Sequence, residues 1–182
     1  MKKLLLALSL TAAFGTTNAA NFVSFDVDKV EDNHAGHAKS TAQYFRAGKD
    51  VAGLNLGVQV RTAVFDKGGM LNSVEVTAGK DLVKGLNTFV GMGYDNGFNG
   101  KVNGDFTYGL VGASTGMPLG KAWGFAGAKT RINWDNDNPK QTVAFAGVSM
   151  PVTKAMSLSA SVSRSYQTIK EDAYGLGLRF AY

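Results

Sequence analysis

Apolar residues alternate strictly with small or polar residues at the C-terminal end of the chain, from Asp172 to Tyr182. Every second position there is apolar or aromatic, namely Tyr174, Leu176, Leu178, Phe180 and Tyr182, and the positions between are Gly175, Gly177, Arg179 and Ala181. Successive side chains of a β-strand point to opposite faces of the sheet. The segment therefore predicts a strand with one apolar face that ends in an aromatic residue. Its other face is small and carries a single charge.

This pattern resembles the C-terminal signature strand of bacterial outer-membrane β-barrels. In that family a glycine is followed by alternating hydrophobic residues and a terminal aromatic residue, positions that Gly177, Phe180 and Tyr182 fill here. The terminal residue of the family is more often Phe, so Tyr182 is a departure. The resemblance implies a small porin-like barrel. It also implies that the outer-membrane assembly machinery reads Gly177, Phe180 and Tyr182 as an assembly signal. The alternative is an ordinary antiparallel edge strand.

The N-terminus has the three parts of a secretory signal peptide. Lys2 and Lys3 precede an apolar run from Leu4 to Phe14, and small and polar residues follow up to Thr17-Asn18-Ala19. The run is shorter than the roughly 20 apolar residues that a transmembrane helix needs. We therefore expect residues 1–19 to be a signal peptide and residues 20–182 to form one exported domain.

Composition narrows what this exported domain can be. The chain has no cysteine, which excludes disulfides, thiol chemistry and covalent haem attachment. Removal of Lys2 and Lys3 lowers the formal net charge from +5 to +3, which is too small to indicate nucleic acid as a partner. The 23 glycines, the three prolines and a mean hydropathy of −0.06 favour membrane strands, in which only every second residue faces lipid.

Two sequence repeats mark turns in the mature chain. AGKDVAGLN at Ala47 to Asn55 recurs as AGKDLVKGLN at Ala78 to Asn87, and Met117 to Trp123 recurs as Met150 to Met156. Each second copy follows the first by roughly 30 residues, the length of one β-hairpin. The alternating segments between these turns predict a closed antiparallel up-and-down transmembrane β-barrel of ten strands. The alternative is eight strands, if one hairpin does not span the membrane.

Short and long connections alternate along the chain. The repeated turns are short, whereas Glu31 to Ser40, Asn96 to Asp105 and Trp134 to Lys140 are longer and polar. Bacterial barrels have short periplasmic turns and longer extracellular loops. We therefore expect a protein of the cell outer membrane that contacts outer-membrane lipid and lipopolysaccharide. Its long loops would be available to an external ligand.

The strand face opposite the apolar one is expected to line the lumen. The charges that we expect there, as a constriction, are Asp26, Asp28, Arg46, Arg61, Glu75, Asp95 and Arg179. The rest of that face is small and includes Gly57, Gly91, Gly93, Gly175, Gly177 and the serines between Ser157 and Ser165. Ten strands with so small an interior leave room for a narrow water-filled path. The alternative is that the charges pair into a network that closes the lumen.

Aromatic residues near the strand ends are expected to face lipid as interface girdles. They are Tyr94, Tyr108, Trp123, Phe125, Tyr166, Tyr174 and Tyr182. Lys129 has the same parity as Trp123 and Phe125, which predicts either a β-bulge between them or a position for Lys129 above the lipid. The terminal strand should close the barrel by pairing with residues 22–30 and 156–168. Arg179 would then lie near Asp26 or Asp28.

Residue types that could carry chemistry are few. His34 and His37 lie beside Glu31 and Asp32 in a Gly-containing loop, which we interpret as a solvated loop and not as a metal site. Neither histidine lies in a strand, so a His-dependent hydrolase of the barrel type is not indicated. The segment 135–138 lacks the glycine and the terminal glutamate of an EF-hand loop. We expect no cofactor, no metal site and no enzyme activity.

Two functions follow from these expectations. The first is a narrow, weakly selective channel for ions or small polar solutes, which the serine- and glycine-rich interior favours. The alternative is a non-conducting structural or surface-recognition barrel that binds a partner through its extracellular loops.

Overall fold

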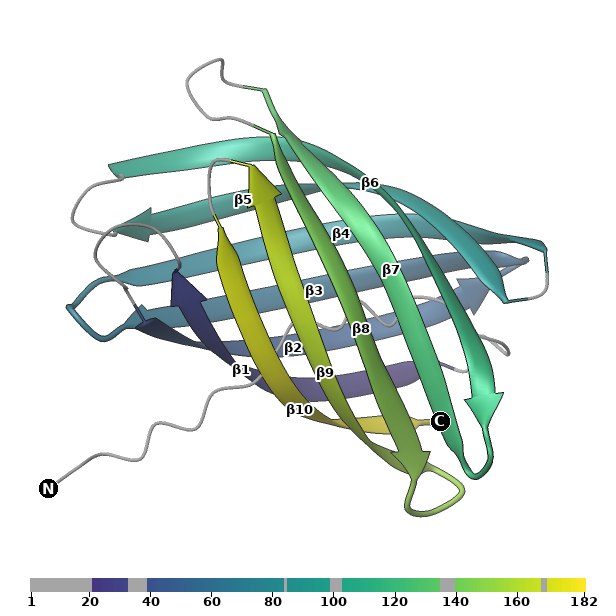
Figure 1. The fold of residues 1–182 in the computed structure, drawn as a ribbon. Coiled ribbons are helices and arrows are strands. Elements are labelled where there is room, and N and C mark those ends of the chain that lie inside the picture. The colour runs from purple at the N-terminus through teal and green to yellow at the C-terminus, as the bar shows by residue number, and fades with distance from the viewer. Residues whose placement is uncertain (1–20, 33–38, 84, 99–102, 135–139, 168–169) are drawn as a thin grey trace, which may run out of the picture.

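A single closed barrel of ten antiparallel strands forms the computed structural model of this protein (Figure 1). The structure describes residues 21–32, 39–83, 85–98, 103–134, 140–167 and 170–182. The strands are β1 (Phe22–Asp32), β2 (Lys39–Val51), β3 (Leu54–Phe65), β4 (Met70–Val83), β5 (Leu86–Phe98), β6 (Asn103–Leu119), β7 (Ala122–Asn133), β8 (Gln141–Pro151), β9 (Met156–Gln167) and β10 (Glu171–Ala181). Each strand pairs with its neighbours in the chain, and β1 pairs with β10. The predicted ten-strand architecture is confirmed, and the eight-strand alternative is wrong.

Tight turns join the strands at one end of the barrel, which we call the short-turn end. At the first repeated turn, β2 ends at Val51 and β3 begins at Leu54, so only Ala52 and Gly53 form the turn. Both residues have positive φ, 56° and 81°, as the hairpin turn that matches strand twist requires. Most of the segment from Ala47 to Asn55 that the sequence analysis treats as a turn is therefore strand. The opposite end, which holds the β1–β2, β5–β6 and β7–β8 connections, is called the long-loop end.

The terminal strand closes the barrel as predicted. β10 pairs with β1 from Phe22 opposite Ala181 to Asp32 opposite Glu171, and its other edge pairs with β9. Beyond the strand, the Tyr182 amide donates to the Asn21 carbonyl at 3.0 Å. The seam is therefore hydrogen-bonded from the chain terminus to the long-loop end, and the barrel leaves no open strand edge.

The outer surface of the barrel is apolar. Outward side chains such as Phe25, Val60, Val90, Leu158 and Leu176 are between 43% and 59% exposed. Within the described residues, no helix has the length and apolar character needed to cross a bilayer. Apolar side chains that alternate with inward polar ones are the pattern of strands whose outer face contacts lipid.

In β6 and β7, the face that was predicted to contact lipid points into the barrel. Tyr108 of β6 is 0% exposed and Phe125 of β7 is 7% exposed, because both lie inside the barrel, and Trp123 packs against the same inner cluster as Phe125. β7 pairs with β6 and β8 without a register shift, so Lys129 shares this inner face. The predicted girdle positions of these three aromatic residues are wrong, and so are both positions predicted for Lys129.

The cost of a charge in lipid explains this orientation of β7. A lysine at the middle of the bilayer costs about 2–4 kcal/mol, whereas an aromatic ring is readily accommodated inside a barrel. The other tyrosines predicted for the girdles do face outward. Tyr94, Tyr166, Tyr174 and Tyr182 are 43%, 49%, 52% and 74% exposed.

Aromatic rings inside the barrel lie opposite glycines on neighbouring strands. The five ring and glycine pairs are Phe22 with Gly48, Phe89 with Gly112, Tyr108 with Gly93, Phe125 with Gly147, and Phe145 with Gly127. In each pair the ring occupies the space that a Cβ atom on the glycine would take. Of the glycines that were expected to leave room for water, Gly93 is covered in this way by the ring of Tyr108.

Candidate functional site

Glu75 lies at the centre of a polar network inside the barrel. It belongs to β4 and is 2% exposed. Its Oε1 accepts hydrogen bonds from the Tyr108 hydroxyl at 2.9 Å and from the Arg131 guanidinium, and its Oε2 accepts from Lys129 Nζ at 2.6 Å and from Gln59 Nε2 at 3.3 Å. Lys129 and Arg131 belong to β7, which β5 and β6 separate from β4. Both cations therefore extend across the lumen to reach Glu75.

Cross-strand register explains why these side chains meet. Arg46, Gln59 and Glu75 lie directly opposite one another on β2, β3 and β4. The same row continues through Gly93 on β5 to Tyr108 on β6. Because Gly93 has no side chain, the ring of Tyr108 leans over it and brings the hydroxyl to Glu75. A continuous row of inward positions thus becomes a hydrogen-bonded chain.

Asp26 ends this chain on the side of the seam. Its carboxylate accepts from the Arg46 guanidinium and from Ser24 Oγ, the latter at 3.1 Å. Arg46 Nε also donates to Gln59 Oε1 at 2.7 Å, which links Asp26 to Glu75 through Gln59. We call the connected residues Ser24, Asp26, Arg46, Gln59, Glu75, Tyr108, Lys129 and Arg131 the Glu75 network.

Aromatic rings hold the arginines of the lumen in place. The stacked pairs are Arg46 on Tyr44, Arg61 on Tyr44, Arg131 on Tyr108 and Arg179 on Phe22, with 4.8, 5.6, 4.8 and 3.9 Å between Cζ and the ring centroid. A guanidinium over an aromatic face is attracted by the ring quadrupole. The rings therefore limit how far these cations can move from the positions in which they meet their carboxylates.

The charged residues predicted for the lumen all lie on the inner face of the barrel. Asp26, Arg46 and Glu75 belong to the Glu75 network. Asp95 adjoins it, because Asp95 Oδ1 accepts a hydrogen bond from the Tyr108 hydroxyl at 3.3 Å and Asp95 Oδ2 lies 3.9 Å from Arg131 Nη1. Asp28 and Arg61 lie closer to the long-loop end, where they border a cavity. Their role as a constriction stays a prediction.

Arg179 lies near Asp26 across the seam, as predicted, but the ion pair of the Asp26 carboxylate is with another residue. It lies opposite Ser24, which has Arg46 on its other side in the same cross-strand row. Both arginines are therefore close to Asp26, and the Asp26 carboxylate forms its ion pair with Arg46. Arg179 acts on Asp26 electrostatically, and its guanidinium rests on the ring of Phe22.

Five members of the network were not predicted from the sequence, namely Ser24, Gln59, Tyr108, Lys129 and Arg131. Parity could have revealed two of them, because Lys129 and Arg131 alternate with Ala128, Thr130 and Ile132. Two cations on one face of a strand identify that face as the lumen side, whatever aromatic residues share it. Tyr108 has no charged neighbour of this kind on its face of β6, and only the register with Gly93 places it.

Other predicted features give no further site. His34 and His37 lie outside the described residues, and so do residues 135–138. Among the residues that the structure describes, no three or more His, Cys, Asp or Glu side chains are placed to hold a metal ion. Gly177 faces the lumen, whereas Phe180 and Tyr182 are 42% and 74% exposed on the outside. The use of these three residues as an assembly signal stays a prediction.

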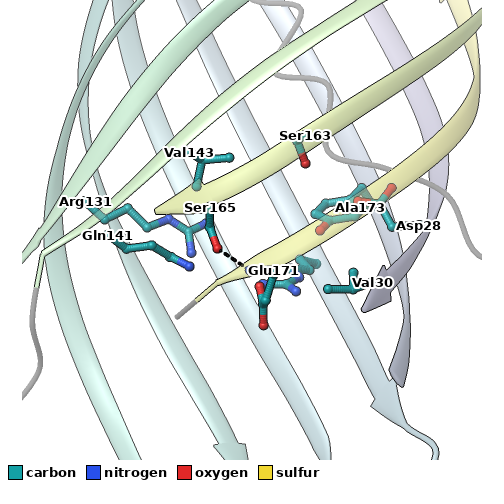
Figure 2. A pocket seen from close by; sticks show the side chains of 11 residues that line it. Asp28, Val30, Arg131, Gln141, Val143, Ser163, Ser165, Glu171 and Ala173 are labelled. Carbon is teal, nitrogen blue, oxygen red and sulfur yellow. Dashed lines mark hydrogen bonds between the residues drawn. The ribbon is translucent and has the colours of Figure 1, made fainter. Parts of the chain in front are cut away.

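A small cavity remains on the long-loop side of the Glu75 network (Figure 2). Its volume is about 40 Å³, and its wall includes Asp28, Arg61, Arg131, Ser165 and Glu171. A water molecule needs roughly 10–15 Å³ of such space, so the cavity holds only a few water molecules.

Comparison with known proteins identifies the fold. No known protein family and no curated protein matches the sequence. The translocator domain of the autotransporter NalP from Neisseria meningitidis is similar in structure, with a TM-score of 0.59 and 12% identity over 93% of this chain and 91% of that chain. Neisserial surface protein A has a TM-score of 0.48, with 16% identity over 89% of this chain and 97% of its own. The KdgM porin has a TM-score of 0.47, with 7% identity over 88% of this chain and 99% of its own.

The similarity to the NalP translocator shows that this chain has the fold of outer-membrane β-barrels. A translocator, a surface protein and a porin are among the similar structures. A fold by itself does not specify a function, so the interior of this barrel has to be considered for itself.

Proposed function

We propose that this protein is an integral outer-membrane barrel whose lumen is closed, and that it acts as a structural or surface-recognition barrel and not as an open channel. The main support for a closed lumen is the position of Glu75. It accepts hydrogen bonds from Lys129 and Arg131 on β7, three strands away around the barrel, as well as from Gln59 on β3 and Tyr108 on β6. An ion that moved along the barrel axis would have to separate these buried charges.

Aromatic packing supports closure at the short-turn end. Phe22 of β1 packs against Phe125 and Phe145 of β7 and β8, and Trp123 packs against the same cluster. β1 is separated from β8 by β9 and β10, so these rings meet inside the barrel and not along one sheet face. Apolar rings exclude water from this part of the lumen, which adds a second barrier to the Glu75 network.

The outer face and the N-terminus support the location. The apolar outward side chains suit lipid, and residues 1–19 have the pattern of a signal peptide that would direct export. In this proposal the terminal strand is read by the outer-membrane assembly machinery, the outer face contacts outer-membrane lipid and lipopolysaccharide, and the long-loop end is open to an external ligand.

A narrow channel is the second candidate. Strands β8 to β10 contribute no member of the Glu75 network, and their inward face carries Ser161, Ser163 and Gly175. The cavity near Asp28 lies against this wall. If the network yielded on that side, a path for ions or small polar solutes would run along the serines.

Planar-bilayer recording on the purified barrel separates the two candidates. The closed-lumen proposal predicts no conductance above the bilayer background for the wild-type protein. It also predicts frequent openings for Glu75→Gln, because the neutral amide leaves Lys129 and Arg131 without their shared carboxylate. Glu31→Gln is the matched control, since Glu31 pairs with Lys29 and Lys39 at the exposed rim. A steady conductance of the wild-type barrel would support the channel and overturn closure.

Surface recognition needs its own test. We would compare wild-type protein with a variant in which residues 33–38 are replaced by a short Gly-Ser linker, on an array of immobilised glycans and matrix proteins. Binding that is lost in the variant supports recognition by the long-loop end. The absence of any binding by the wild-type protein would leave a purely structural barrel.

A further inference from the structure

Asp28 of β1 is a buried carboxylate without a hydrogen-bond partner. The residue is 0% exposed, and neither carboxylate oxygen has a partner among the described residues. The Tyr44 side chain approaches it without completing a hydrogen bond. Buried polar groups in proteins are almost always hydrogen-bonded, so an exception of this kind requires a reason.

Unpartnered donors lie around the same cavity. Nε of Arg61 and Nε of Arg131 are buried and have no hydrogen-bond partner in the part of the chain that the structure describes. Arg131 uses its terminal nitrogens toward Glu75 and Asp95, which leaves Nε. Asp28, Arg61 and Arg131 all border the cavity of about 40 Å³. The cavity is therefore bordered by one side chain with unused acceptors, Asp28, and by two with unused donors, Arg61 and Arg131.

The strands keep Asp28 and Arg61 apart. They belong to β1 and β3, and β2 lies between these strands. The guanidinium of Arg61 stacks on Tyr44 of β2, 5.6 Å from the ring centroid. The two charges act on each other electrostatically, yet within the described ranges neither oxygen of Asp28 has a hydrogen-bond partner. Opposite charges that are held apart on the wall of a small cavity can be bridged by a molecule that carries both signs.

Hydroxyl groups and a second carboxylate complete the wall. Ser163 and Ser165 of β9 and Glu171 of β10 border the cavity between Asp28 and Arg131, as Figure 2 shows. Ser165 Oγ accepts a hydrogen bond from the Glu171 amide at 2.9 Å, which fixes the start of β10 against β9. The charged groups of the wall are thus two carboxylates and two guanidinium groups.

We propose that this cavity binds a small zwitterion, a molecule whose ammonium and carboxylate groups lie close together, as in the smallest α-amino acids. The ammonium group would donate to Asp28 and Glu171, and the carboxylate would accept from Arg61 and Arg131. A simple cation would meet the two arginines, and a simple anion would meet Asp28 and Glu171. The cavity has room for about three water molecules, which limits the ligand to a few heavy atoms.

The zwitterion site can be tested separately from closure of the lumen, although Arg131 belongs both to the Glu75 network and to the cavity wall. Closure rests on the Glu75 network and on the rings at the short-turn end, whereas the zwitterion site lies at the long-loop side of that network. Ligand binding is measured by heat, and conduction by current. A failure of one proposal therefore leaves the other standing.

Isothermal titration calorimetry on the purified, detergent-folded barrel tests the site with glycine as the probe. Sodium acetate and methylammonium chloride, at matched ionic strength, each supply one half of the zwitterion. We expect saturable binding of glycine, and binding of either half at least tenfold weaker. Equal binding of acetate or methylammonium would overturn the proposal in favour of a simple ion site. If glycine gives no heat of binding even at high concentration, the cavity holds only water, and the proposal is overturned as well.

Variants locate the binding. Asp28→Asn and Arg61→Gln should each weaken glycine binding at least tenfold, whereas Asp66→Asn, an exposed carboxylate beyond β3, should leave it unchanged. Unchanged affinity in both cavity variants would refute the assignment to this cavity. Asp28→Asn should fold, because it removes a buried charge that has no hydrogen-bond partner. If a variant does not fold, the unfolding temperature of the wild-type protein is the test. Glycine should raise that temperature, and acetate and methylammonium should not.

Discussion

Gly177 on β10 lies directly opposite Asp26 on β1, and the Asp26 carboxylate occupies the space where a Cβ atom of residue 177 would lie. The same carboxylate pairs with Arg46 inside the lumen. Gly177 is therefore required structurally, apart from any assembly signal, because it leaves room for Asp26 at the seam where the barrel closes.

Substitution of this glycine should destabilise the folded barrel. Gly177→Ala places a methyl group against the Asp26 carboxylate and Ser159 Oγ, and overpacking of this kind costs about 1–3 kcal/mol. Urea unfolding of protein already inserted in vesicles measures the loss. Gly109→Ala is the control, since its added methyl group would meet only the ring of Trp134 at ordinary contact distance. If residue 177 served assembly alone, Gly177→Ala would slow insertion and leave the unfolding midpoint unchanged.

The centre of the Glu75 network should be the most sensitive position in the lumen. Glu75→Gln leaves Lys129 and Arg131 buried without a carboxylate between them, and breaking a buried ion pair in this way costs about 3–5 kcal/mol. Glu31→Gln, which touches only exposed ion pairs, should cost less than about 1 kcal/mol. Thermal unfolding followed by circular dichroism compares the two. Equal losses would mean that the network contributes no more than a surface pair.

The sequence was sufficient to predict the barrel itself. Strict alternation in β3, β9 and β10 defined their lipid and lumen faces, and the repeated turns predicted the hairpins that the structure contains. The alternation does not specify where a strand stops, because a two-residue turn such as Ala52 and Gly53 needs almost no sequence of its own. β1 and β2 therefore extend further than predicted, and the first repeated turn is shorter.

The interior was predicted in part, for a physical reason. A single carboxylate such as Glu75 identifies the inner face of its own strand, because a charge in lipid is costly. An aromatic ring is tolerated on either face, so Tyr108 and Phe125 carry no such information. Which ring fills the space over which glycine depends on register between strands. Residues far apart in the chain decide that register, and the closure of the lumen follows from it.

The hydroxyl of Tyr108 provides a fine test of that register. Tyr108→Phe keeps the ring over Gly93 and removes the hydroxyl, which donates to Glu75 at 2.9 Å and to Asp95 at 3.3 Å. A hydrogen bond to a charged group contributes about 1.5–3 kcal/mol, and we expect a loss in that range. Tyr94→Phe removes a hydroxyl from the outer face, where the side chain is 43% exposed, and should be nearly neutral. The difference in urea unfolding free energy between the variants is the measurement. A neutral Tyr108→Phe would contradict the inward position of this ring.

The two tryptophans lie on opposite sides of the barrel wall, and lipid quenching can distinguish them. Trp123 packs beside Phe125 inside the barrel, whereas Trp134 is 61% exposed and its ring lies over the outward position of Gly109. We expect brominated lipids to quench the fluorescence of the Trp123→Phe variant, which retains only Trp134. The Trp134→Phe variant retains only Trp123 and should be quenched several-fold less. Strong quenching of Trp123 would place it in the lipid girdle. Because Lys129 lies on the same face of β7 as Trp123, that result would also place Lys129 in lipid. A lysine in the middle of the bilayer costs about 2–4 kcal/mol, so we do not expect it.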